Sequence, residues 1–167
     1  ATPESKSSRQ PSLLTNTQLD ALLSIQKAVD NNKTTVMKLD AGEGKTFLSK
    51  ISKHLFNITS SPIIHIAPFA QDERDWVSLP LTDKGTVDFS RLENGTHYWV
   101  KQQDMITHLE SPTDIEPLKN ALIFCDEYDR YPDLNKRLDQ VGCRKRCNMS
   151  ATDNLEEVNQ KILEASV

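Results

Sequence analysis

Hydrophobic residues along this chain recur at two spacings, one typical of helices and one typical of strands. Over residues 16–31, Leu19, Leu22, Leu23 and Val29 follow the helical spacing, which predicts a helix with one apolar face. The candidates for its N-terminal cap are Thr15, Asn16 and Thr17.

The same pattern divides the rest of the chain into short, alternating strands and helices. Strands are expected at 34–39, 62–68, 96–100, 121–125 and 146–152. Helices are expected at 45–56, 70–79, 102–110, 132–141 and 154–165. This alternation predicts an α/β fold whose mainly parallel sheet has helices on both faces. In such sheets ligands bind at the carboxyl ends of the strands.

Composition indicates an ordinary soluble domain. The chain has 167 residues and a formal net charge of −4, so no overall basic field attracts nucleic acid. Residues 1–12 are polar and are expected to form a flexible tail, with one domain over 13–167. No membrane segment or signal peptide is recognisable, and the three cysteines are sparse, so we expect a cytoplasmic protein with reduced thiols.

The stretch "LDAGEGKTF" lies between an expected strand and an expected helix, as a phosphate-binding loop does. Gly42 and Gly44 would let backbone N–H groups face a phosphate. Lys45 would reach the β- and γ-phosphates, and the Thr46 hydroxyl would ligate magnesium. Leu39 stands where the simple motif has its first glycine, so an ordinary turn that starts a helix is the alternative.

Two further stretches follow expected strands. In "ALIFCDEYD" an apolar strand delivers Asp126, which could hold magnesium, and Glu127, which could deprotonate an attacking water. The alternative is a pair of solvated acids in a turn. In "NMSATD" the residues Ser150 and Thr152 have no phosphate chemistry of their own, and a turn that caps the last helix is the alternative.

Together the three stretches resemble the first motor lobe of the superfamily-two (DEAD-like) ATPases. The metal motif D-E-x-D of that family matches residues 126–129, and its S-A-T motif matches residues 150–152. The resemblance implies a RecA-like P-loop sandwich of three layers that binds ATP and Mg²⁺. It also implies that Gln18 reads adenine, and that Ser150 and Thr152 couple the nucleotide site to another lobe or to the substrate.

The loop itself is similar to that of the preprotein-translocase ATPase family (SecA), mainly through Glu43. The "Arg-Asp" pair at 74–75 also fits that family, and this resemblance implies a motor that acts on polypeptide. Ala41 departs from its usual threonine, while Pro68 and the S-A-T motif favour an RNA or DNA helicase. The nucleotide-binding set implied by the resemblance is Gln18, Ala41, Gly42, Glu43, Gly44, Lys45 and Thr46.

In these families a second lobe completes the ATP site, and this sequence stops one helix after the third motif. We therefore expect a piece of a larger motor protein, in which hydrolysis by Glu127 and Lys45 requires the second lobe. The alternative from another class is a non-catalytic module that binds nucleotide or a partner protein.

The remaining features are expected to be structural. The cluster "CRKRC" at 143–147 is interpreted as a solvated turn that enters a strand, rather than a metal, redox or nucleic-acid site. His65 is expected in the core, and Trp76, Tyr98 and Trp99 are expected to be packing residues rather than base-stacking ones.

Overall fold

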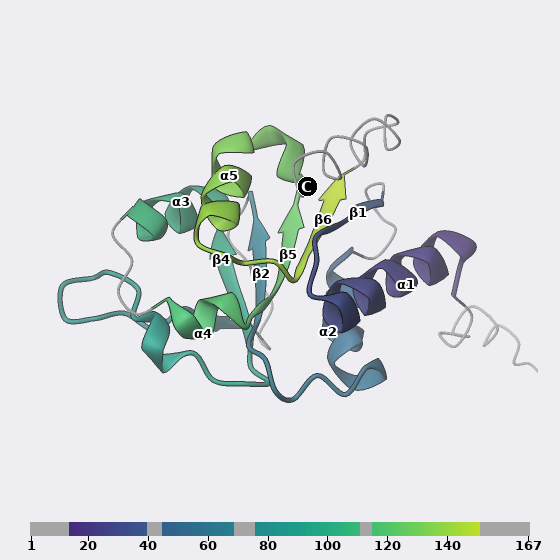
Figure 1. Cartoon of the computed structure of the whole chain (residues 1–167), viewed down its shortest axis with the longest axis horizontal. Coiled ribbons are helices and arrows are strands. Elements are labelled where there is room, and N and C mark those ends of the chain that lie inside the picture. The colour runs from purple at the N-terminus through teal and green to yellow at the C-terminus, as the bar shows by residue number, and fades with distance from the viewer. Residues whose placement is uncertain (1–13, 40–44, 69–75, 111–114, 151–167) are drawn as a thin grey trace, which may run out of the picture.

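Figure 1 shows a sheet with helices on both of its faces. The computed structural model describes residues 14–39, 45–68, 76–110 and 115–150. The strands are β1 (Thr35–Lys38), β2 (Ile63–Ala67), β3 (Val77–Ser78), β4 (His97–Lys101), β5 (Leu122–Asp126) and β6 (Arg146–Ser150). The helices are α1 (Asn16–Asn31), α2 (Lys45–Leu55), α3 (Gln102–Glu110), α4 (Glu116–Lys119) and α5 (Pro132–Gln140), with 3₁₀ turns η2 (Phe89–Arg91) and η3 (Tyr128–Arg130).

The six described strands form one sheet in the order β1-β6-β5-β2-β4-β3, and every neighbouring pair is parallel. This confirms the predicted α/β class with a parallel sheet. The last two strands, β5 and β6, return between β1 and β2. The direction of the crossovers therefore reverses between β2 and β5, which makes that boundary the switch point of the sheet.

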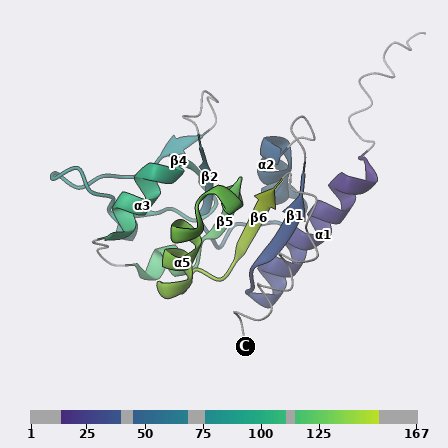
Figure 2. The same ribbon diagram turned by 90° about the horizontal axis from the view of Figure 1, so that it is seen from above.

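The two faces of the sheet carry separate hydrophobic clusters. Ile63 and Phe124 belong to the cluster under α1 and α2, whereas Ile64 and Ile123 belong to the cluster on the opposite face. Figures 1 and 2 show α3, α4 and α5 on that opposite face. Strand β5 is buried on both faces, as its wholly apolar sequence predicts, because alternate side chains point to opposite sides.

Helix α1 begins with a capping box at Thr15, which is one of the three cap candidates. Thr15 Oγ1 accepts a hydrogen bond from the Gln18 backbone N–H at 3.1 Å, and Gln18 Oε1 accepts one from the Thr15 backbone N–H at 3.1 Å. The helix ends at Asn31, and Asn32 follows in the left-handed region with φ 52°. The predicted apolar face of this helix is wrong in part, because Leu19 and Leu23 are exposed.

The face of α1 that packs is centred on Ile25, which is fully buried. Its buried residues are Ala21, Leu22, Ile25 and Ala28. The two alanines carry only a methyl group, so the helix backbone approaches β1 and β6 closely, and this contact turns Leu19 and Leu23 toward solvent.

Two other elements differ from the expectation. The predicted helix at 70–79 is wrong at its end, because Val77 and Ser78 form β3 and pair with Tyr98 and Trp99. Pairing with β4 outweighs local propensity there. Helix α4 was not predicted, since it has only four residues.

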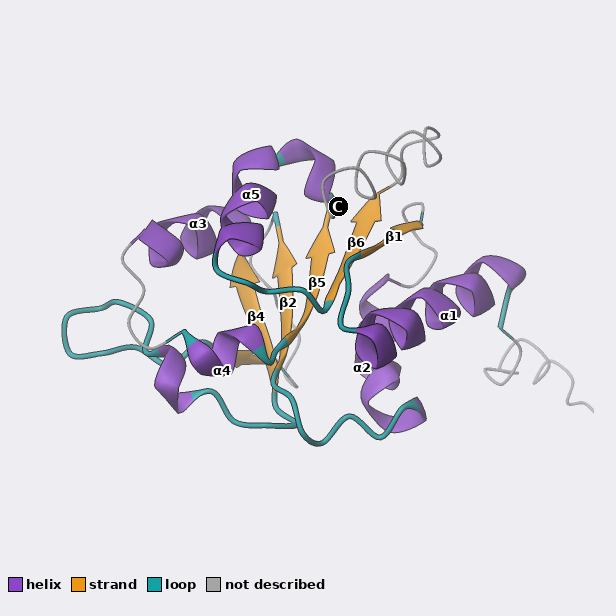
Figure 3. Cartoon of the chain, in the orientation of Figure 1, coloured by secondary structure: helices purple, strands orange, loops and turns teal. Residues whose placement is uncertain are grey.

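Figure 3 separates the described helices and strands from the rest of the chain. The predicted tail at 1–12 and the predicted helix at 154–165 lie outside the described residues. Among the helices that are described, none has the length and apolar character needed to cross a membrane.

Leu22→Ala and Leu23→Ala form a matched test of the corrected face of α1. Leu22 is 7% exposed and Leu23 is 56% exposed. We expect Leu22→Ala to lower the free energy of unfolding by about 2–5 kcal/mol, because it empties packed volume. Leu23→Ala should change it by about 0.5 kcal/mol or less. Urea unfolding measures both values, and equal losses would contradict this assignment.

Candidate functional site

The carboxyl ends of β1, β6 and β5 lie side by side at one edge of the sheet. Met149 of β6 is in register with Asp126 on one side and with Met37 on the other. The Leu39 backbone N–H donates to the Ser150 carbonyl at 2.9 Å, so the two chains stay together past the end of β1. At roughly 4.8 Å per strand, the ends of β1 and β5 are about 10 Å apart.

Asp126 shares a face of the sheet with α2. Phe124 packs in the cluster under α1 and α2, and Asp126 is two residues further along the same strand, so it lies on the same face. The side chain of Asp126 is partly buried. Helix α2 begins at Lys45, directly after the predicted phosphate loop. A carboxylate and a helix N-terminus therefore lie on one side of the sheet.

Several predicted site residues lie outside what the structure describes. These are Ala41, Gly42, Glu43, Gly44 and Thr152, together with the side chains of Lys45 and Thr46. Ser150 is described and is 2% exposed at the end of β6. Arg74 and Asp75 also lie outside the described residues, whereas Pro68 follows β2 directly and is partly buried.

Gln18 takes part in the structure of α1. Its side-chain oxygen accepts the hydrogen bond that closes the capping box at Thr15. Its role in reading adenine stays a prediction. The capping box holds Gln18 at the start of a helix that packs against β6 and against β1, the strand that precedes the predicted phosphate loop in the sequence.

Glu127 has an unusual backbone conformation. Its φ of 49° and ψ of 45° are in the left-handed region, which costs an L-residue roughly 1–2 kcal/mol. Its carboxylate lies 3.3 Å from the Arg130 guanidinium, and because Arg130 is exposed and Glu127 is only partly buried, the pair contributes about 1 kcal/mol at most. Strain of this kind often accompanies function.

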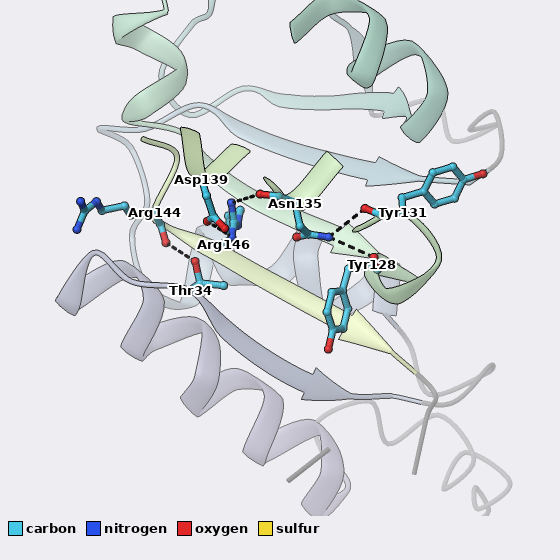
Figure 4. Close-up of polar contacts among 7 residues, drawn as sticks. All are labelled: Thr34, Tyr128, Tyr131, Asn135, Asp139, Arg144 and Arg146. Atoms are coloured by element: carbon cyan, nitrogen blue, oxygen red, sulfur yellow. Dashed lines mark hydrogen bonds and ion pairs between the residues drawn. The ribbon is translucent and has the colours of Figure 1, made fainter. Parts of the chain in front are cut away.

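The "CRKRC" segment is a turn that enters a strand, as expected, but only part of it is solvated: Arg144 is exposed, whereas β6 begins at the buried Arg146. Arg146 is 3% exposed and forms an ion pair with Asp139 of α5 at 2.5 Å. A second guanidinium nitrogen of Arg146 donates to the Asn135 carbonyl at 3.4 Å. Figure 4 shows this chain of contacts between β6 and α5, together with the bond from Thr34 to the Arg144 carbonyl. Arg146 of this cluster therefore fastens α5 to the sheet.

The three thiols are buried and protonated. Burial raises the pKa of Cys125, Cys143 and Cys147 from an ordinary value of 9.0 to about 12. None of them is in a disulfide. At neutral pH they are poor nucleophiles and poor metal ligands, which agrees with the expectation of reduced thiols.

Histidine and tryptophan side chains pack together on the α2 face of the sheet. His65 is fully buried and stacks on Trp99 with ring centroids 4.3 Å apart, while Trp76 meets both rings edge-on. His65 Nδ1 lies 3.2 Å from the Ser49 hydroxyl of α2. The expected core role of His65 and the packing roles of Trp76 and Tyr98 are confirmed, since all three are buried.

The residues at this edge of the sheet could hold magnesium only together with ligands from another molecule, such as waters or phosphates. Among the described residues, no group of three His, Cys, Asp or Glu side chains is placed to hold a metal ion by itself. Magnesium in proteins is commonly held by one or two carboxylates together with waters and substrate phosphates. Asp126, a partly buried carboxylate at a strand end, fits that donor set.

Sequence reasoning missed Gln102, Asn135 and Arg146, which contact the turn after β5 or its neighbours. The available signal was weak: Arg146, Asn148 and Ser150 are polar at every second position of an expected strand. Such a pattern is typical of a solvent-facing side, and here α5 and η3 cover it.

No protein-family model matches the chain, and a search of curated proteins finds no relative.

Glu127→Gly and Glu127→Ala test the strain at the turn. Glycine adopts positive φ freely, so the Gly variant should have a free energy of unfolding about 1 kcal/mol higher than the Ala variant. Asp129, two residues later in η3, has no positive φ. There the Gly variant should be no more stable than the Ala variant. The same order of stability at both positions would contradict a left-handed Glu127.

The thiols predict a loss of stability at high pH. Their folded-state pKa is raised, so their contribution is complete below pH 9 and is lost as the pH rises from 9 toward 12. The free energy of unfolding should fall by up to about 1.4 kcal/mol per thiol per pH unit in that range. Urea unfolding at pH 8, 9 and 10 measures how the free energy of unfolding falls with pH. In Cys125→Ala this fall should be smaller by the contribution of one thiol. An unchanged slope would mean that this thiol ionises equally in both states.

Proposed function

We propose that this chain is the ATP-binding lobe of a motor ATPase of the superfamily-two type, with a RecA-like P-loop fold. The observation that carries the proposal is the arrangement at one edge of the sheet. The strand that enters the "DAGEGKT" loop, the strand that ends in Asp126 and the strand that ends in Ser150 are adjacent there, with β6 in the middle.

Each residue then has a distinct part in the proposed chemistry. The loop amides of residues 41–44 and the Lys45 ammonium hold the phosphates, and the N-terminus of α2 adds its dipole. Thr46 and Asp126 hold magnesium, which supplies charge neutralisation to the phosphoryl group being transferred. Glu127 orients the attacking water and accepts its proton. The ion pair of Glu127 with Arg130 is weak enough to open when water and nucleotide enter.

The lobe works as part of a larger assembly in this proposal. A second RecA-like lobe closes on the nucleotide from the edge at which β6 ends in Ser150, with Ser150 and Thr152 coupling the two lobes, and polypeptide is the substrate. Glu43 and the surrounding loop support polypeptide, because they match the translocase pattern more closely than the helicase one. If the protein bound single-stranded RNA with an affinity that falls steeply with salt concentration, the proposed substrate would be nucleic acid instead of polypeptide.

Calorimetric titration of ATP with magnesium tests the proposal. The wild-type chain should bind, and Lys45→Ala should weaken the affinity by about 10- to 100-fold, because a charge-assisted bond to phosphate is worth about 1.5–3 kcal/mol. Glu127→Gln should retain binding and lose whatever hydrolysis the lobe shows, with or without its partner lobe.

Lys53→Ala is the matched control, since Lys53 lies in the last turn of the same helix. It should leave the affinity for ATP unchanged. Binding that is insensitive to Lys45→Ala, or absent from a folded wild-type chain, would contradict the proposed function.

A further inference from the structure

The turn that carries Asp126 and Glu127 is held at its first residue by a buried amide. Gln102, the first residue of α3, has no exposed surface, and its Nε2 donates to the Asp126 carbonyl at 2.5 Å. Because β2 lies between β4 and β5 in the sheet, this side chain reaches past the carboxyl end of β2. It connects the ends of two strands that do not touch.

A second amide holds the other end of the turn. Asn135 of α5 donates through Nδ2 to the Tyr128 carbonyl at 3.2 Å and to the Tyr131 carbonyl at 3.4 Å (Figure 4). The backbone carbonyl of Asn135 in turn accepts from Arg146, whose position is set by the ion pair with Asp139. The position of Asn135 is therefore tied to β6.

Glu127 lies between these two fixed carbonyls. A residue in the left-handed region persists only where its surroundings determine its conformation, and here the bonds to Asp126 and Tyr128 flank the strained residue. The direction of the Glu127 side chain thus depends on two amides from two different helices.

These amides are costly where they stand. The Gln102 and Asn135 side-chain oxygens are buried and have no hydrogen-bond partner, which costs roughly 1–3 kcal/mol for each such group. An apolar side chain of similar volume would avoid this cost. Stability alone therefore does not account for two amides at these positions.

We propose that Gln102 and Asn135 form an amide clamp on the backbone of this turn, which positions the Asp126 carboxylate toward the magnesium ion of a bound nucleotide and the Glu127 carboxylate toward the attacking water. This inference rests on the proposed function. Both are positioning residues, since they act through the backbone of the turn. Loss of such an outer-shell partner typically weakens metal affinity by about 10- to 100-fold.

The test measures metal affinity and nucleotide affinity separately in the variants Gln102→Met and Asn135→Leu. Each substitution keeps the approximate volume of the side chain and removes its amide group. Calorimetry with ADP in the presence of a chelator gives the metal-free affinity. Electron paramagnetic resonance of Mn²⁺ gives the metal affinity of the ADP complex. We expect each variant to weaken the Mn²⁺ affinity about tenfold and to leave the metal-free ADP affinity unchanged.

Asn120→Leu is the matched control. Its amide donates to the Ser60 carbonyl at 2.7 Å, and it lies just before the amino end of β5, away from the turn. It should change neither affinity. Should Gln102→Met fail to fold, Gln102→Asn shortens the amide by one methylene and should show the same loss of Mn²⁺ affinity. Folded variants with unchanged Mn²⁺ affinity, or with equal losses of both affinities, would overturn the clamp.

A readout without nucleotide distinguishes failure of the clamp from failure of the proposed function. The backbone chemical shifts of Glu127 report its left-handed conformation by NMR. We expect them to move toward the right-handed or extended range in Gln102→Met and to stay in place in Asn120→Leu. A wild-type chain that binds no nucleotide would reject the proposed function. Unmoved Glu127 shifts in Gln102→Met would reject the clamp.

Discussion

The pairing of β6 with both β1 and β5 is the constraint on which the rest of this structure depends. β6 is the last described strand along the chain, yet it lies between the strand that enters the "DAGEGKT" loop and the strand that ends in Asp126. Parallel strands end at a common edge, so this pairing brings residues about ninety positions apart in sequence to one side of the sheet. Removing β6 would leave β1 with no strand partner among the described residues.

The same strand explains why the interior on the α5 side is polar. Arg146, Asn148 and Ser150 are all buried, although a central strand of a parallel sheet is usually apolar on both faces. Arg146 is compensated by Asp139 and by the Asn135 carbonyl, whereas Arg146 Nε and Asn148 Oδ1 have no hydrogen-bond partner. An interior of this kind gives up stability, and the ion pair returns little of it, because the Asp139 side chain is 60% exposed to solvent. The clearest structural consequence of the Arg146 contacts is that they fix the position of α5 relative to the sheet. Through Asn135 they also fix the turn after β5.

Local patterns in the sequence were sufficient where one element decides its own structure. The apolar run that forms β5 and the alternation of strands and helices have short-range causes, and the structure bears them out, while one of the three cap candidates, Thr15, is the cap of α1. The errors arose where a distant partner decides. Leu23 was predicted to be a core residue, but α1 packs on β1 through its alanine-bearing face. Val77 was predicted to be helical, but it pairs with β4. Arg146 was predicted to be solvated, but it is buried and forms an ion pair with α5. Of the site, the sequence identified the side chains that bear the proposed chemistry but not the amides that contact their backbone.

A linear motif identifies the groups that carry chemistry, while the geometry of those groups depends on residues that no motif contains. The apolar strand that leads to Asp126 and Glu127 is easily recognised in the sequence. The left-handed conformation of Glu127 is not, and the carbonyls on either side of it accept hydrogen bonds from amides of α3 and α5. Those amides come from positions 24 residues before Asp126 and seven residues after Tyr128. Each of these hydrogen bonds goes to a backbone carbonyl, which every residue type has. The residue that accepts the bond therefore cannot be recognised from its side chain in the sequence. A search for function in this fold therefore has to follow the hydrogen bonds to the backbone of the turn as well as the carboxylates that the turn presents.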